Sequence, residues 1–184
     1  MQVLARCPAK AQNSAMRTLI LMRHAKAVRA HEAASDEARG LTERGRKDAA
    51  LAGAAMEDAR LKPGLALVST AQRTRETAEH ALMGFALEAQ LDRALYHAAP
   101  ENIWDAFNAN DSESVVIIGH NPGMAELTSM LINQAHDRSQ LAREFAGHFP
   151  TAAFAAFEVK GDLLRAAGPR LLAAWKPERR GGDD

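Results

Sequence analysis

The sequence predicts an α/β fold, a three-layer α/β/α sandwich with a mostly parallel central sheet. Three short, strongly apolar runs, residues 18–22, 65–69 and 115–119, have the length and composition of buried strands. Each run is followed, directly or after a polar loop, by a segment with the 3.6-residue apolar spacing of an amphipathic helix. This βαβα alternation places helices on both faces of a parallel sheet. The chain of 184 residues is 47% hydrophobic and is most simply one domain.

In the first half of the chain, strand 18–22 is followed by a polar loop. Thr42 then begins a helix whose small apolar residues recur at the spacing of a buried stripe, and residues 62–64, Lys-Pro-Gly, end it. The strand at 65–69 leads into a helix expected from about residue 71 to 83. These elements form the first two strand–helix units of the predicted sheet.

In the second half, Pro100 begins a helix that carries apolar side chains at helical spacing. The strand at 115–119 leads into a helix from residue 122 with an apolar face. Two last runs, 152–159 and 171–175, are predicted to be strands. The apolar residues of the two helices are Ile103, Trp104, Phe107, Met124, Leu127 and Leu131.

The domain is expected to occupy residues 17–176. Residues 1–16 are predicted to be a flexible N-terminal extension, because no sustained apolar pattern is present there. Residues 177–184 are polar and are predicted to be a flexible tail.

Charge and cysteine content limit the compartment and the partners. Lys plus Arg and Asp plus Glu are equal at 23 each, which argues against a nucleic-acid surface, because that surface needs a basic excess. The single cysteine, Cys7, excludes an intrachain disulfide and fits a reducing cytoplasm. No stretch approaches the ~20 apolar residues of a membrane span, and the N-terminal residues lack the apolar segment of a signal peptide. We therefore expect a cytoplasmic protein without nucleic-acid or membrane partners.

Cationic and imidazole side chains follow three of the predicted strands. Arg23 and His24 come directly after the first strand, Arg73 follows the second, and His120 comes directly after the third. Ligands of open α/β sheets bind outside the carboxyl ends of the strands, so these four side chains can converge. Two guanidinium groups and two imidazoles at one point predict a site for a doubly charged anion, most simply a phosphoryl group.

Helix starts are expected to fix two of these side chains. Asn121 is a suitable N-cap and Pro122 suits the first helical position, which would hold His120 at a strand–helix junction. Residues 69 and 70, a serine and a threonine, are expected to cap the helix that begins near residue 71 and to place Arg73 in its first turn. Arginine is unfavourable at the positive end of a helix dipole unless an anion is bound there.

These segments resemble the histidine phosphatase superfamily, and in particular its SixA-type phosphohistidine phosphatase branch. The phosphoglycerate mutase-like members of the superfamily open with Arg-His-Gly, where this chain has Arg23-His24-Ala25. The similar segments are residues 21–27, 41–45, 69–77, 95–96, 118–123 and 149–152. The resemblance runs from about Thr18 to Trp175 and implies the phosphoglycerate mutase-like α/β/α fold.

The resemblance implies a covalent mechanism without metal or other cofactor. His24 would attack phosphorus and carry the phosphoryl group, and water would then hydrolyse the phosphohistidine intermediate. Arg23, Arg73 and His120 would hold the phosphoryl oxygens. His24 must be neutral to attack, whereas His120 is best protonated, so the two roles require opposite shifts in pKa.

The proton donor for the leaving group is not evident. Relatives that act on phosphate esters carry a carboxylate after the third conserved segment, and the candidates here are Glu88, Asp92 and Glu101. None lies in a convincing motif, and Glu101 also suits a helix start. An imidazole leaving group, with a pKa of about 6.5, departs with little help. A weak or absent acid therefore favours a phosphohistidine substrate over a phosphate ester.

Other polar side chains are candidates for the rim of the site, although solvated charges or helix caps are the simpler explanation for them. These are Lys26, Arg29, Arg39, Thr74 and Asn121, of which Lys26 and Asn121 are the candidates for substrate binding. His97 lies in a loop that could reach the mouth of the site. The remaining histidines show no partner pattern and are expected at the surface: His31, His80, His136 and His148. No carboxylate or cysteine lies at metal-ligand spacing from His24 or His120.

Three functions remain open on the sequence. The first is a cytosolic phosphohistidine phosphatase acting on a phosphorylated protein, for example a phosphorelay domain. The second is a phosphatase or mutase for small phosphorylated metabolites that are phosphate esters. The third is a non-catalytic module that binds phosphoproteins through the same pocket.

Overall fold

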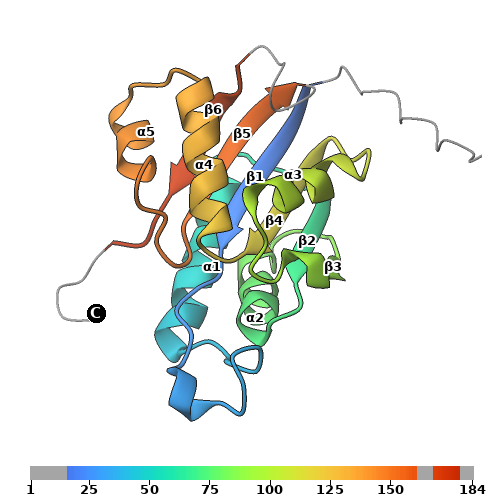
Figure 1. The fold of residues 1–184 in the computed structure, drawn as a ribbon, viewed down its shortest axis with the longest axis vertical. Coiled ribbons are helices and arrows are strands. Elements are labelled where there is room, and N and C mark those ends of the chain that lie inside the picture. The colour runs from blue at the N-terminus through green and yellow to red at the C-terminus, as the bar shows by residue number, and fades with distance from the viewer. Residues whose placement is uncertain (1–15, 161–167, 179–184) are drawn as a thin grey trace, which may run out of the picture.

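A single sheet in the order β3-β2-β4-β1-β5-β6 organises the computed structural model, which describes residues 16–160 and 168–178 (Figure 1). The strands are β1 (Met16–Arg23), β2 (Leu65–Ser69), β3 (Ala89–Asp92), β4 (Ser114–Gly119), β5 (Phe154–Lys160) and β6 (Arg170–Trp175). Strands β3, β2, β4 and β1 run parallel to one another. Beyond β1, strand β5 pairs antiparallel with β1, and β6 pairs antiparallel with β5. The predicted α/β fold with a mostly parallel sheet is confirmed.

The helices cover both faces of this sheet. They are α1 (Glu43–Asp58), α2 (Gln72–Ala81), α3 (Pro100–Asn108), α4 (Gly123–Gln134) and α5 (Gln140–Phe145), with short 3₁₀ turns η1 (Ala30–Glu32) and η2 (Arg93–Leu95). The predicted start at Thr42 is confirmed, because its hydroxyl accepts a hydrogen bond from the Gly45 N–H at 3.0 Å and caps α1. Pro100 occupies the first turn of α3, as predicted.

The central strands are apolar throughout because both of their faces are buried. In β1, Leu19 and Leu21 point towards α3 and α4, whereas Ile20 and Met22 point towards α1 and α2. All four side chains have no exposed surface. A shift of one residue in the pairing of β1 would exchange the two faces, so packing on both sides fixes its register.

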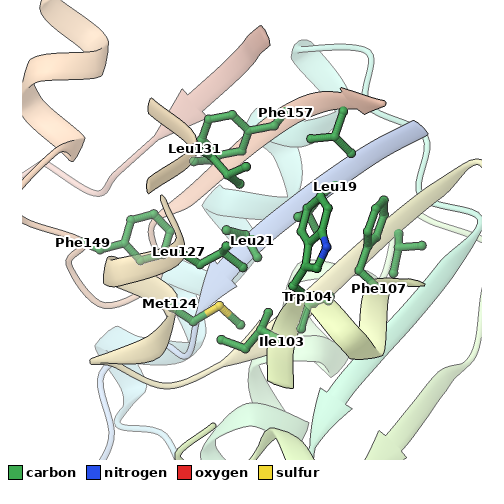
Figure 2. Close-up of a cluster of buried hydrophobic side chains, with 14 of the residues drawn as sticks. Leu19, Leu21, Ile103, Trp104, Phe107, Met124, Leu127, Leu131, Phe149 and Phe157 are labelled. Carbon is green, nitrogen blue, oxygen red and sulfur yellow. The ribbon is translucent and has the colours of Figure 1, made fainter. Parts of the chain in front are cut away.

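Figure 2 shows the half of the core between the sheet and helices α3 and α4. Leu19 and Leu21 of β1 meet side chains from both helices, together with Phe149 and Phe157. The helix residues that the sequence predicts for this face all belong to it: Ile103, Trp104, Phe107, Met124, Leu127 and Leu131. Full burial of such a side chain contributes about 1.5–3 kcal/mol.

Two predicted helix caps are wrong. The N-cap position of α2 is Ala71 without a side-chain hydrogen bond, and the Ser69 hydroxyl lies against His120 instead. Helix α4 begins at Gly123, and the Asn121 side chain donates to a distant carbonyl rather than capping it. In both cases the folded chain offers the side chain a partner from another strand end or loop.

Some predictions concern residues that the structure does not describe. Met16 already belongs to β1, whereas residues 1–15 of the predicted extension and residues 179–184 of the predicted tail lie outside the described residues. In the part of the chain that is described, no helix combines the length and apolarity needed to cross a membrane.

Candidate active site

The four side chains predicted to converge lie at the carboxyl ends of three neighbouring strands. Arg23 ends β1 and pairs in register with Gly119, the last residue of β4. The His24 N–H donates to the Gly119 carbonyl at 3.0 Å, and His120 is the next residue. The imidazole centroids of His24 and His120 are therefore only 5.2 Å apart. Arg73, in the first turn of α2 as predicted, approaches from the end of β2.

The His24 ring is held in one tautomer. Its Nδ1 lies 2.8 Å from the Ala25 carbonyl, which can only accept, so Nδ1 carries the proton. Burial, helped by the positive charges of Arg73 and Arg23, lowers the pKa of His24 to about 3. The ring is therefore neutral at pH 7, and its Nε2 keeps a free lone pair. Such a nitrogen can act as a nucleophile.

The His120 side chain is buried, with 2% of its surface exposed, and a hydrogen bond also fixes its ring. Its Nε2 lies 2.8 Å from the Ser69 hydroxyl, and its buried Nδ1 has no hydrogen-bond partner among the described residues. Burial, helped by the positive charge of Arg73, lowers the pKa of His120 to about 3. Both imidazoles are thus neutral, whereas the sequence analysis expected opposite shifts. A bound dianion would favour the protonated form of His120.

The backbone carbonyl of Phe149 accepts hydrogen bonds from two side chains of the site. Arg23 Nη1 donates to it at 3.0 Å, and Asn121 Nδ2 donates to it at 3.0 Å. Arg23 Nε is buried without a hydrogen-bond partner among the described residues, as is His120 Nδ1. Folded proteins pair nearly all buried polar nitrogens, so each unpaired nitrogen here requires an explanation. Oxygen atoms of an anion would supply partners for both.

Asp36 is the site residue that sequence reasoning missed. Arg73 Nη1 donates to its backbone carbonyl at 2.6 Å, and Arg73 Nη2 donates to its Oδ2 at 2.9 Å. The Tyr96 hydroxyl donates to the same Oδ2 at 2.7 Å. Arg39 Nη1 donates to Oδ1 at 2.9 Å. Hydrogen bonds from Tyr96, Arg39 and Arg73 hold the pKa of this carboxyl well below its usual range, so Asp36 is ionised.

The loop that carries Asp36 is attached to the start of α2. The backbone carbonyl of Glu37 accepts a hydrogen bond from the Gln72 N–H at 2.8 Å. An anionic side chain thus lies beside Arg73 in the first turn of α2, where the sequence analysis expected an anion to compensate the charge of the arginine. No motif or spacing connects residue 36 with residue 73, so only the folded loop reveals the pair.

Tyr96 and His97 form one wall of the site. The Tyr96 ring stands edge-on to the His120 ring at 5.3 Å, and the His97 ring stacks on it at 5.1 Å with an interplanar angle of 28°. A Cβ on Gly123 would collide with the backbone carbonyl of Ala98, so glycine at this helix start lets the loop approach His120. His97 therefore lies at the mouth of the site, which the sequence analysis considered within reach of its loop.

The remaining candidates for substrate contact are less central. The Lys26 side chain is exposed and makes no hydrogen bond or ion pair within the described ranges, and Arg29 is exposed. Arg39 belongs to the Asp36 cluster. The Thr74 hydroxyl is buried against the Ser69 and Ala71 carbonyls, at 2.8 and 2.6 Å, which is a structural role.

None of the three candidate proton donors contacts the two imidazoles. The Asp92 carboxylate accepts from the Ala94 N–H at 2.8 Å and caps η2. Glu88 is exposed ahead of β3, and Glu101 is exposed in the first turn of α3, where the helix dipole favours it. Within residues 16–160 and 168–178, no group of three or more His, Cys, Asp or Glu side chains is arranged to hold a metal ion.

Comparison with known proteins identifies the class. Residues 19–99 match the model of the histidine phosphatase superfamily (branch 1). An uncharacterized protein of Mycobacterium tuberculosis is 30% identical over 142 residues, which cover 76% of this chain and 88% of that protein. The chain belongs to the histidine phosphatase superfamily, and it is a phosphatase by class.

Solved structures place the chain more narrowly. A SixA protein from Nakamurella multipartitia superposes with a TM-score of 0.76 and 29% identity, covering 89% of this chain and 97% of that one. A SixA protein from Agrobacterium tumefaciens gives a TM-score of 0.73 and 28% identity, with coverages of 88% and 99%. Within the superfamily, the chain belongs to the SixA-type branch.

Proposed function

We propose that the protein is a phosphohistidine phosphatase that works through a phosphorylated His24. The observation that carries the proposal is the state of the His24 ring. Its Nδ1 is tied to the Ala25 carbonyl, and its neutral Nε2 is left beside two arginines and a second imidazole. Nε2 would attack phosphorus, and water would then release phosphate from the intermediate.

The other site residues would bind the phosphoryl oxygens. Arg23 Nε and His120 Nδ1 are buried nitrogens without partners, and phosphoryl oxygens would satisfy both. Arg73 would add a second guanidinium, and Asn121 would steady the Phe149 carbonyl that orients Arg23. Charge that spreads over three oxygens in the transition state would meet cationic donors already in place. These side chains would stabilise the negative charge that a metal ion stabilises in other phosphatases, so we propose a metal-independent reaction.

The substrate follows from the protonation of the carboxylates. Asp36 is ionised and accepts hydrogen bonds from three side chains, so it cannot donate a proton to an alkoxide. Glu88, Asp92 and Glu101 do not contact the site. Without a carboxylic acid as donor, the site suits the P–N bond to imidazole better than a P–O bond, because an imidazole leaving group needs less assistance than an alkoxide. The two similar SixA proteins are described as "putative phosphohistidine phosphatase". The substrate would be a phosphohistidine-bearing protein, for example a phosphorelay domain, and the compartment the cytoplasm.

Rates on two substrate classes test this function. The purified protein is given a histidine-phosphorylated peptide and, in parallel, a panel of sugar phosphates, with and without EDTA. We expect hydrolysis of the peptide at a kcat/KM well above that of any sugar phosphate, with no effect of EDTA. Preference for the esters would identify a small-metabolite phosphatase instead, and inhibition by EDTA would contradict metal independence.

The covalent intermediate requires its own measurement. Rapid acid-free quenching should trap a phosphoenzyme that is stable to base and labile to acid, and His24→Asn should abolish both the label and turnover. The matched control is His80→Gln, a histidine near the far end of α2. Binding of phosphopeptide without turnover by the wild-type protein would indicate a non-catalytic module. Vanadate and tungstate, which mimic the oxyanion, should inhibit.

A further inference from the structure

We infer that His97 donates the proton to the leaving atom of the substrate and later accepts one from the attacking water. This inference rests on the proposed phosphatase function. It assigns the acid–base role to an imidazole of the loop after η2, whereas the sequence analysis sought that role among carboxylates.

The position of His97 is the first observation. Its ring stacks on that of His120 at 5.1 Å, and the His120 ring lies 5.2 Å from His24. The side chain is 51% exposed, so it reaches the site from the solvent side. A leaving group points away from the nucleophile in an in-line displacement, towards the open side of the pocket. Because His97 is far more exposed than His120, we assign the leaving group to the side of His97.

The surroundings of the two ring nitrogens of His97 are the second observation. Its Nε2 lies 3.6 Å from Asp36 Oδ2, and Nδ1 makes no hydrogen bond to the described residues. Asp36 is itself fixed by Arg73 and by the Tyr96 hydroxyl. A carboxylate close to one ring nitrogen orients the ring, while the other nitrogen stays open to a ligand.

The backbone of His97 is the third observation. Its φ is +50°, in the left-handed region that non-glycine residues rarely adopt. Close packing of Ala98 on Gly123 and the contact between the Tyr96 and His97 rings hold the loop in this conformation. Residues retained in such conformations cluster at functional sites.

Other groups at the mouth are poorer donors. Asp36 has no proton to give. Tyr96 already donates its hydroxyl proton to Asp36, and burial together with that carboxylate raises the pKa of the phenol. An imidazole ring can both donate and accept a proton, as a group that acts first as acid and then as base must do.

The proposed step balances as follows. The Nε2 lone pair of His24 forms the bond to phosphorus, and the electron pair of the breaking bond stays on the leaving oxygen or nitrogen. That atom takes the Nδ1 proton of the His97 imidazolium, so the product leaves neutral. In the second half-reaction neutral His97 takes a proton from water as the oxygen attacks phosphorus. Phosphate and free His24 are released, and His97 returns to the imidazolium form.

The test is a series of substrates with leaving groups of increasing basicity. It runs from 2,4-dinitrophenyl phosphate through p-nitrophenyl and phenyl phosphate to methyl phosphate. The variant is His97→Asn, because asparagine tolerates a positive φ and cannot transfer a proton at neutral pH. We expect kcat/KM to fall about 10²–10⁴-fold for methyl phosphate and to change little for the dinitrophenyl ester, whose leaving group needs no proton.

A second variant separates chemistry from folding. His97→Gly also accepts the backbone conformation, and added imidazole should restore its activity on methyl phosphate but not change that on the dinitrophenyl ester. His80→Gln is the matched control and should behave as wild type. An equal loss on every substrate, or no rescue, would overturn the inference.

The same data distinguish this inference from the proposed function. Loss of turnover and of phosphoenzyme in His24→Asn, combined with a uniform effect of His97→Asn, would keep the phosphatase mechanism and remove His97 as the proton donor. Turnover that survives His24→Asn would instead overturn the proposed function itself.

Discussion

Acid should destabilise the protein chiefly through His24 and His120. In the unfolded chain each imidazole has a pKa of about 6.5, whereas burial lowers the folded pKa of each to about 3. Between these values the unfolded state binds protons that the folded state does not bind. The free energy of unfolding is therefore fully retained above pH 6.5 and decreases as the pH falls towards 3.

The expected magnitude follows from proton linkage. At pH 5 each folded imidazole is still neutral, so the loss depends on the unfolded pKa and amounts to about 2 kcal/mol per histidine. The pair should lose about 4 kcal/mol between pH 8 and pH 5, a large part of the stability of a typical domain. His120→Gln, which preserves a polar atom opposite Ser69, should lose only about half as much.

Urea denaturation at several pH values measures this effect. The fluorescence of Trp104, which is 7% exposed in the folded protein, reports unfolding. The wild type, His24→Gln and His120→Gln are compared in buffers without phosphate, because a bound dianion would raise the pKa of His120. Identical pH slopes for all three proteins would refute the conclusion that the two imidazoles are buried in the neutral form.

Three further predictions concern packing and positioning. Ser69→Ala removes the hydroxyl 2.8 Å from His120 Nε2 and should lower kcat about tenfold in steady-state assays, the effect of about 1.4 kcal/mol. Gly123→Ala drives a Cβ into the Ala98 carbonyl and should lower the free energy of unfolding by about 1–3 kcal/mol in urea, with slower turnover because the loop of His97 moves. Phe107→Ala, at a ring that is 1% exposed, should lower the free energy of unfolding by about 3–5 kcal/mol in the same assay. A loss under 1 kcal/mol for either packing variant, or an unchanged kcat for Ser69→Ala, would contradict the contacts described.

Much of the fold could be predicted because its elements carry strong periodic patterns. The runs around Leu19, Leu67 and Ile117 are apolar on both faces, which only strands buried between two helix layers require. Strand β3 and helix α5 were missed since they have only 4 and 6 residues. A segment of that length completes too little of any period to be recognised.

The site was predictable as far as it follows directly from strand ends. Arg23, His24 and His120 are placed by the sheet itself, and Arg73 by the first turn of a helix after β2. The role of Asp36 was not predictable, because a loop positions it through hydrogen bonds to Arg73, Tyr96 and Arg39.

The failed caps have a related cause. Ser69 and Asn121 have the right chemistry for a helix start, but tertiary partners compete with the helix N–H groups for them. When a side chain has several possible hydrogen-bond partners, the complete fold determines which one it contacts, and the local sequence does not show this.

The central place of β1 has a consequence for biosynthesis. Its two neighbours in the sheet, β4 and β5, lie about 95 and about 140 residues further along the chain. A ribosome therefore exposes the apolar segment 19–22 long before either neighbour has been translated. Pairing on each side of β1 must wait until β4 and then β5 have left the exit tunnel. Such distant pairings make folding slow, so the growing chain is a natural client for chaperones that shield nascent apolar segments.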